Sequence, residues 1–469
     1  MELSKKGYLD EETKTVPEFD STRQVWRNVI VICTGFLFLF TAFQSLQSLQ
    51  SSLFKDEGMG TTVLAVIYGS LVVSSFFVPS PLIATMGCKW TLTISMACYI
   101  SFMAAHFYAS WALFIPAAII LGLGAAPLWG SKSHMVNTLA HEYAQKRKIT
   151  NDAGANLFFG TFFLFFQSAS VWGNVIASQV LAPAGSNSSI EFLSDVELAK
   201  CGKGFCPQIK DSNNTNLDRP SDEKLYMLAG IYTGCACLAV IIVGVFLQQL
   251  PIERNLKIGR CSKEICKPRI IAATFLHMKD YRQALLIPLT MYSGLEQAFF
   301  ASDYTQAFIT CPLGNWWVGY VVICYGAMNA CCSLLFGKLV QYVGRIPFFV
   351  LGALINIALV TTFLTFQITQ ENLYIYFILA GFWGMADAIW QTQINALYGV
   401  LFKDSHEAAF SNYRLWESIG FIIAFGYQSR LCLPIKAYIL LAFLGLGIMG
   451  FSIVEWQERR NKTNKMNVN

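Results

Sequence analysis

Twelve apolar runs constrain the fold of this chain more than any other feature. They begin near residues 28, 62, 90, 112, 157, 226, 284, 318, 346, 373, 414 and 436. A helix needs roughly 20 apolar residues to cross the hydrocarbon core of a bilayer. Only 13% of the residues are charged, whereas soluble proteins have about a quarter. The sequence therefore predicts an all-α polytopic membrane protein with twelve transmembrane helices.

The distribution of Lys and Arg predicts that both termini are cytoplasmic. In that orientation the cytoplasmic segments hold 26 of the 34 basic residues, and five of the remaining 8 lie in one long outer loop. Cytoplasmic loops of membrane proteins carry such an excess of positive charge. We expect no cleavable signal peptide, because 27 mostly polar residues precede a first run of full membrane length.

The long outer loop, residues 182–224, is expected to be glycosylated. It is polar and carries two acceptor sequons, which begin at Asn187 and Asn213. A third sequon, at Asn461, lies in the expected cytoplasmic tail and should remain unmodified. Cys201 and Cys206 in the same loop are a candidate disulfide in an oxidising lumen, with two unpaired thiols as the alternative.

A basic segment, residues 251–283, separates two sets of six predicted spans. It holds eight Lys or Arg residues and is either a solvated connector or a short interfacial helix carrying Ile271, Phe275 and Met278. Short weak matches between the two halves, among them the glycines near residues 122 and 381, are all separated by nearly the same number of residues. This common spacing indicates two parallel six-helix repeats. The predicted order is a cytoplasmic tail (1–27), a six-helix bundle (28–250), the linker (251–283), a second bundle (284–456) and a cytoplasmic tail (457–469).

A polar stripe crosses the apolar segment 379–395. Gly384, Asp387, Gln391 and Asn395 share one face at helical spacing, and this register centres the Asp387 carboxylate at mid-membrane depth. A buried charge at that depth persists only where it is paired, hydrated or functional. Asp387 is therefore either a ligand-contacting or proton-exchanging group, or a carboxyl that fastens this helix to its neighbours.

Other ionisable residues are candidates for the same central cavity. Glu296 and Asp303 stand seven residues apart in the seventh span, so regular helical spacing places them on one face. Together with Asp387 and Gln391 they form the candidate cavity lining. Near the cytoplasmic end of the eleventh span, Arg414 and Glu417 form a candidate inner-mouth pair at i, i+3 spacing. Lys132 and His134 in span four add a basic edge at comparable depth.

Motifs in both halves resemble the Unc-93 (uncoordinated-93) family, and within it the vertebrate A-type branch. The matching segments are QSLQSSL (47–53), GLGAAPLW (122–129), ADAIWQTQ (386–393) and NYRLWESIGFIIAFGY (412–427). The resemblance extends from about residue 28 to residue 456 and implies the major facilitator fold. It also implies a role as an accessory regulator of two-pore potassium channels or as a trafficking escort of immune receptors. The Asp-Arg pair usual in the superfamily's loop motif is replaced by Gln341 and Tyr342 in one half, and by Ala84 and Thr85 in the other.

Enzymatic and metal-dependent functions are not expected. Gly337-Lys338 lacks the context of a phosphate-binding loop, and Gln145 and Phe410 stand where a zinc-protease helix needs its second histidine. We expect no cofactor, no metal and no nucleic-acid partner. The leading hypothesis is a regulator of a potassium channel in the plasma membrane, with lipids and an ion-channel subunit as partners. The alternatives are a secondary transporter of a small organic solute and, less favoured, a receptor escort.

Overall fold

Twelve long helices build the part of the chain that the computed structural model describes, which comprises residues 19, 21–54, 58–149, 151–182, 193–208, 220–250, 279–402 and 406–468. Eight of them are long and apolar enough to cross a membrane. The six of the N-terminal half are α1 (Thr22–Leu53), α2 (Met59–Phe77), α3 (Pro79–Ala105), α4 (Trp111–Arg147), α5 (Asn151–Leu181) and α7 (Asp222–Phe246). The six of the C-terminal half are α10 (Tyr281–Ala298), α12 (Asn315–Val343), α13 (Ile346–Thr365), α14 (Tyr374–Leu401), α15 (His406–Gln428) and α16 (Leu433–Val468).

Helix boundaries lie close to those expected, for identifiable local reasons. Ser21 caps α1 by accepting a hydrogen bond from the Gln24 backbone, which extends the helix beyond its apolar run. The third span begins earlier than its apolar core because α3 contains a bend at Gly87, whose φ of 75° suits only a residue without a side chain. The segment around Phe275, for which a solvated connector and a short interfacial helix were the two alternatives, lies outside the described residues.

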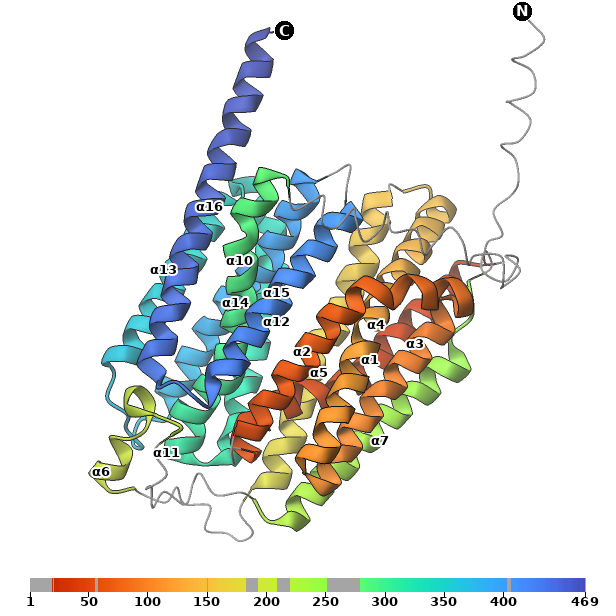
Figure 1. The fold of residues 1–469 in the computed structure, drawn as a ribbon. Helices are drawn as coiled ribbons and strands as arrows, with labels where there is room; N and C mark the ends of the chain where they lie inside the picture. Colours follow the sequence, from red (N-terminus) through yellow and green to blue (C-terminus); the bar gives the residue numbers. More distant parts are fainter. Residues whose placement is uncertain are drawn as a thin grey trace, which may run out of the picture.

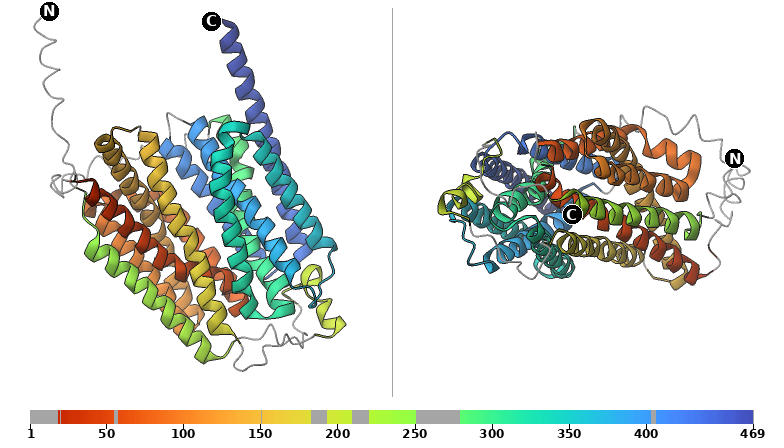
Figure 2. Two further views of the ribbon diagram at one scale, coloured as in Figure 1. Left: turned by 180° about the vertical axis from the view of Figure 1, so that it is seen from behind. Right: turned by 90° about the horizontal axis from the view of Figure 1, so that it is seen from below.

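The two halves stand side by side as separate bundles (Figures 1 and 2). They meet where α2 packs on α15, α5 packs on α12 and the end of α1 packs on the segment after α10. Tyr68 of α2 stacks on Phe421 of α15 with ring centroids 4.2 Å apart. We call the end where α1 begins and α16 ends the terminal face, and the opposite end the disulfide face.

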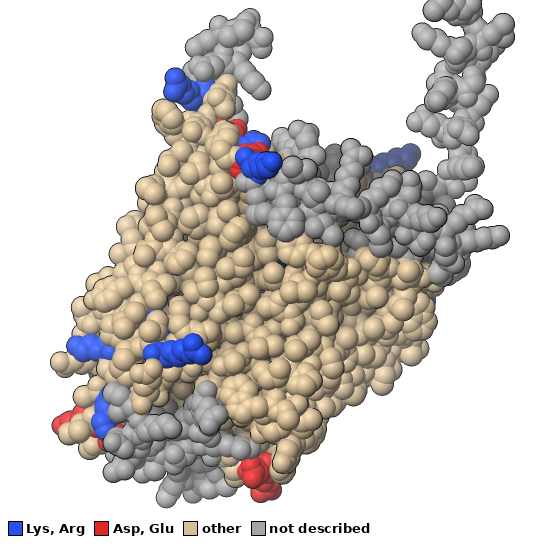
Figure 3. Space-filling model, viewed as in Figure 1, with Lys and Arg blue, Asp and Glu red and all other residues tan. Residues whose placement is uncertain are grey.

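Charged side chains are sparse on the flank of the molecule between these two faces. In Figure 3 the middle of that flank is almost entirely free of Lys, Arg, Asp and Glu. Large apolar side chains are exposed on the outside of the bundles, and those of Leu354, Val245 and Trp172 are more than half exposed. Such an apolar exterior belongs in lipid, because in water it would be a large exposed hydrophobic surface.

A π-helix, η5 (Phe299–Thr310), continues α10 toward the disulfide face and ends in α11 (Cys311–Leu313). A π-helix has more residues per turn than an α-helix, so it changes the direction of the side chains that follow. The expectation that Glu296 and Asp303 share one face is therefore wrong. Glu296 lies in the regular α10, whereas Asp303 lies within the wider turn and points to another helix.

The predicted pairing of Cys201 with Cys206 is also wrong. Cys201 is bonded to Cys311 of α11, and Cys206 is bonded to Cys432 just before α16. The segment 193–208 lies against the C-terminal half, and each of its two cysteines is bonded to a cysteine of that half. Neither partner could be identified from loop spacing, because they are 110 and 226 residues distant.

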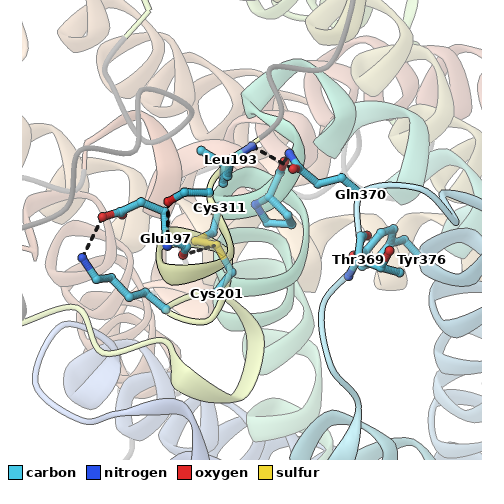
Figure 4. The surroundings of a disulfide bond; sticks show 10 residues. Leu193, Glu197, Cys201, Cys311, Thr369, Gln370 and Tyr376 are labelled. Carbon is cyan, nitrogen blue, oxygen red and sulfur yellow. Dashed lines mark hydrogen bonds and ion pairs between the residues drawn. A yellow bond between two sulfur atoms is a disulfide. The ribbon is translucent and has the colours of Figure 1, made fainter.

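Hydrogen bonds hold the same loop segment on the C-terminal half. The Leu193 backbone donates to Gln370 at 2.9 Å, beside the Cys201–Cys311 disulfide (Figure 4). On the other side, the Leu433 backbone donates to the Phe205 carbonyl at 3.0 Å. A loop that belongs in sequence to the N-terminal half thus covers the disulfide face of the C-terminal half. The predicted glycosylation sites, Asn187 and Asn213, lie outside the described residues.

Candidate functional site

A close approach of α14 to α12 creates the environment of Asp387. A Cβ atom on Gly384 would lie 2.3 Å from the Tyr325 backbone oxygen, so only glycine permits this helix contact. The N-terminal half has the same device, since a Cβ on Gly122 of α4 would lie 2.4 Å from the Ile67 carbonyl of α2. The packing of α14 on α12 in the C-terminal half thus has a counterpart in the packing of α4 on α2 in the N-terminal half.

Asp387 is buried and accepts two short hydrogen bonds from α12. Tyr325 Oη donates to Oδ2 at 2.6 Å and Asn329 Nδ2 donates to the same oxygen at 2.5 Å. The side chain is only 2% exposed. The carboxylate therefore fastens α14 to α12, which is the structural role considered in the sequence analysis. Its Oδ1 atom forms no hydrogen bond of normal geometry among the described residues, and Gln391 is a further polar neighbour.

Glu296 of α10 lies beside Asp387. The two carboxyl groups interact electrostatically, and Glu296 is fully buried. Neither of its oxygens forms a hydrogen bond of normal geometry within the described residues, and its polar neighbours are Asp387 and Trp383. Two negative charges side by side in an apolar interior are costly, so this arrangement favours a proton or a cation held between them. The structure thus brings together two of the predicted cavity residues, inside the C-terminal half.

A chain of polar contacts leads from this pair toward the terminal face. Gln391 Nε2 donates to Ser293 Oγ at 3.2 Å, and Ser293 lies 3.5 Å from Glu417 Oε1. Tyr413 donates to the same Glu417 oxygen at 2.9 Å, and Arg414 Nη1 donates to Oε2 at 2.7 Å. The predicted Arg414–Glu417 pair is therefore formed. Glu417 is buried, whereas the Arg414 side chain is 50% exposed.

The Trp residues of α14 belong to the core of the C-terminal half. Trp383 and Trp390 are fully buried. Trp383 stacks on Phe299 with centroids 5.5 Å apart, and Trp390 Nε1 donates to Asn356 Oδ1 at 2.7 Å. These contacts pack α14 against η5 and α13. The tryptophan face therefore stabilises the bundle, while the polar stripe meets α12 and α10.

Asp303 forms a buried ion pair with Lys436 of α16. The Lys436 Nζ and Asp303 Oδ1 atoms are 2.5 Å apart, and the two side chains are 0% and 1% exposed. Lys436 Nζ also donates to the Gln428 carbonyl at 2.6 Å. Lys436 was not among the candidate residues of the sequence analysis. Its position within an apolar run is the signal that could have found it.

Side chains near this ion pair join the two halves at the disulfide face. Gln428 donates to Gln306 at 2.5 Å, and Thr61 of α2 donates to Gln428 at 3.2 Å. Gln306 donates to the Ser51 carbonyl of α1 at 2.9 Å. We call these residues, with the pairs Ser51–Ser302 (3.2 Å) and Ser52–Thr310 (2.8 Å), the interhalf belt. The QSLQSSL segment supplies the α1 side of this belt.

Within the described residues, the N-terminal half has no equivalent of the carboxylate pair at the corresponding positions of α4. Pro127 and Ser131 occupy the positions of α4 that correspond to Asp387 and Gln391, and both are buried. Ser131 Oγ has no hydrogen-bond partner in the described part of the chain. The buried carboxyl pair therefore belongs to the C-terminal half alone among the described residues, whereas α4 carries a buried cation, Lys132, one residue after Ser131.

The architecture defines a polytopic protein of the major facilitator fold. A solved structure of the nucleoside transporter NupG has a TM-score of 0.55 at 12% identity, covering 92% of this chain and 98% of its own. The xylose transporter XylE from E. coli, in a partially occluded inward-open conformation, has a TM-score of 0.57 at 12% identity, covering 92% of this chain and 99% of its own. At such low identity these similarities show the fold alone.

The family model described as "Ion channel regulatory protein UNC-93" matches residues 56–452. Protein unc-93 homolog A of Xenopus laevis is 49% identical over 437 residues, 92% of this chain and 93% of its own, and the human homolog A is 45% identical over 435 residues, 93% of this chain and 94% of its own. The chain therefore belongs to the UNC-93 family, which confirms the resemblance and the predicted fold class. The putative potassium channel regulatory protein unc-93 of Caenorhabditis elegans is 34% identical over 92% of this chain and 61% of its own length.

Proposed function

We propose that this protein is a non-enzymatic accessory regulator of a potassium channel in the plasma membrane. Its membership of the UNC-93 family supports this role, as does its similarity to a nematode protein named as a putative potassium channel regulator. The apolar flank offers a surface on which a channel subunit could pack within the bilayer.

The proposed orientation places the terminal face in the cytoplasm. The excess of Lys and Arg on that side supports it. The disulfides support it as well, because structural disulfides form and persist in an oxidising compartment, and both lie at the opposite face. In this orientation three segments are cytoplasmic: the N-terminal tail (1–27), the linker (251–283) and the C-terminal tail (457–469). The linker joins the two six-helix bundles, 28–250 and 284–456. Asn187 and Asn213 are then proposed glycosylation sites.

The observation that carries the regulatory proposal is the interhalf belt. A transporter that alternates its access would have to break these hydrogen bonds and separate α1 from η5 in each cycle. The loop segment 193–208, bonded covalently to the C-terminal half, lies over the same face. Both features favour a protein that keeps one arrangement while its exterior engages a partner.

A cross-link across the belt tests this proposal. Ser52 Oγ and Thr310 Oγ1 are 2.8 Å apart, so the double variant Ser52→Cys/Thr310→Cys should form a disulfide that locks the halves together. We expect the locked protein to co-purify with a potassium channel and to alter its current as the unmodified protein does. Each single variant controls for the substitutions. Loss of regulation in the double variant alone would contradict a static role.

The Glu296–Asp387 pair supports a second candidate, secondary transport of an organic solute. Adjacent buried carboxyls can exchange a proton during transport, and intramembrane ionisable residues commonly mark such pathways. Purified protein in liposomes should then show saturable uptake or proton flux that Asp387→Asn abolishes while the fold is retained. A stoichiometric channel complex without flux would exclude this alternative.

A further inference from the structure

Lys132 of α4 is a buried cation without an anionic partner. Its side chain is only 4% exposed. Among the residues that the structure describes, no carboxylate and no hydrogen-bond acceptor contacts its ammonium group, while its charge interacts with that of Arg414. A lysine in a membrane interior is costly unless it is paired or used, and it marks a functional site by default.

Aromatic rings surround the Lys132 ammonium instead of carboxylates. Its Nζ lies 4.3 Å from the ring centroid of Phe162 and 5.0 Å from that of Trp129. Two further rings, Phe159 and Phe163, lie at 5.5 and 5.6 Å. Cation–π contacts offset part of the cost of burial and hold the ammonium in position, but they leave its positive charge uncompensated.

The other half supplies a second cation to the same place. The guanidinium carbon of Arg414 lies 5.9 Å from the Trp129 ring, so α4 and α15 each bring a positive group to one indole. Glu417 neutralises one of the two charges through its 2.7 Å bond to Arg414. With Lys132 protonated, the group formed by Lys132, Arg414 and Glu417 has a net charge of +1 and an aromatic wall. The half-exposed Arg414 keeps it accessible to solvent.

We propose that Lys132, Arg414 and Trp129 form a binding site for a monoanionic amphipathic molecule between the two halves. The anionic group would lie between the ammonium and the guanidinium, whose planar donors suit carboxylate, sulfonate or phosphate oxygens. The apolar body of the molecule would pack on Trp129 and its neighbouring phenylalanines. The ligand joins α4 to α15 and so couples the two halves at a position distant from the interhalf belt.

The test uses the full chain in nanodiscs of neutral phosphatidylcholine. The soluble probe is naphthalene-2-sulfonate, and the matched control probe is naphthalen-2-ylmethylammonium, with the same ring system and the opposite charge. Because a ligand that binds only the folded state raises its melting temperature, we expect a rise with the sulfonate and none with the ammonium. Adding phosphatidylglycerol in place of the sulfonate tests whether a lipid headgroup occupies the site.

Lys132 variants establish where the probes bind. We expect Lys132→Gln to weaken sulfonate binding in calorimetry by about tenfold or more, as when one charge of a paired contact is lost, and Lys132→Arg to retain most of it. Lys89→Gln is the matched control, because Lys89 also lies over an indole ring, that of Trp90 at 5.2 Å, outside this site. Without ligand, Lys132→Met should melt at the same temperature as the unmodified protein or higher, because it removes an unpaired buried charge.

Each outcome is decisive. If the sulfonate raises the melting temperature and Lys132→Gln weakens its binding, the site binds a soluble anion. If only phosphatidylglycerol raises the melting temperature, the site binds a lipid headgroup. The proposal is overturned if neither anion stabilises the protein, if the sulfonate and ammonium probes act alike, or if Lys132→Gln and Lys89→Gln have the same effect.

Discussion

The buried ion pair between Asp303 and Lys436 makes the sharpest prediction about stability. Both side chains are essentially inaccessible, and the charges are 2.5 Å apart. Removing one partner from a buried ion pair leaves an uncompensated charge and costs about 3–5 kcal/mol. Lys436→Met should therefore lower the free energy of unfolding by about that amount, since it also removes the hydrogen bond to the Gln428 carbonyl.

The double variant Asp303→Asn/Lys436→Met should recover much of this loss, because no buried charge then remains. A double-mutant cycle, measured by SDS-induced unfolding in detergent micelles, should give a coupling energy of about 2 kcal/mol or more. Arg459→Met is the control. Its ion pair with Glu455 is on the surface, with the Arg459 side chain 68% exposed, so a change within about 1 kcal/mol is expected. Additive effects of the two buried substitutions would refute the reasoning.

Three further predictions concern helix packing, loop docking and topology. Gly384→Ala should destabilise the protein by about 1–3 kcal/mol, because the added Cβ would collide with α12. Gly399→Ala is the control, because a Cβ there meets open space, and the melting temperatures of the two variants should differ accordingly. Cys311→Ser should expose one additional thiol, that of Cys201, to a maleimide under denaturing, non-reducing conditions; an unchanged thiol count would contradict the disulfide pairing. Glycan mapping should find no sugar on Asn461, and a sugar there would overturn the proposed orientation.

The fold was predictable because the information that specifies it is local. Apolar run length determines which segments can span a bilayer, and most helices begin within a few residues of the expected positions. The third span departs most, because Gly87 allows a bend that composition does not reveal. The polar stripe of α14 was readable for the same reason, since helical periodicity assigns neighbours on one face without reference to the rest of the chain.

Contacts between distant segments were less predictable. Asp387 was recognised as a residue that fastens a helix or contacts a ligand, but its donors, Tyr325 and Asn329, follow from the close approach that Gly384 allows. The π-helix separates Asp303 from Glu296, because a local change of helical pitch alters every later direction. Sequence spacing therefore identified three carboxylates that are buried, Glu296, Asp303 and Asp387, and misplaced one of them.

The sequence alone determined the class of protein, the number of long helices, the repeat and the family, because each depends on composition, periodicity or similarity along the chain. Only the tertiary structure decided the cysteine pairing, the ion partner of Asp303 and the meeting of Lys132 with Arg414 at one indole. These contacts join residues more than 100 positions apart. Their geometry follows from how whole helices pack, which no local pattern in the chain encodes.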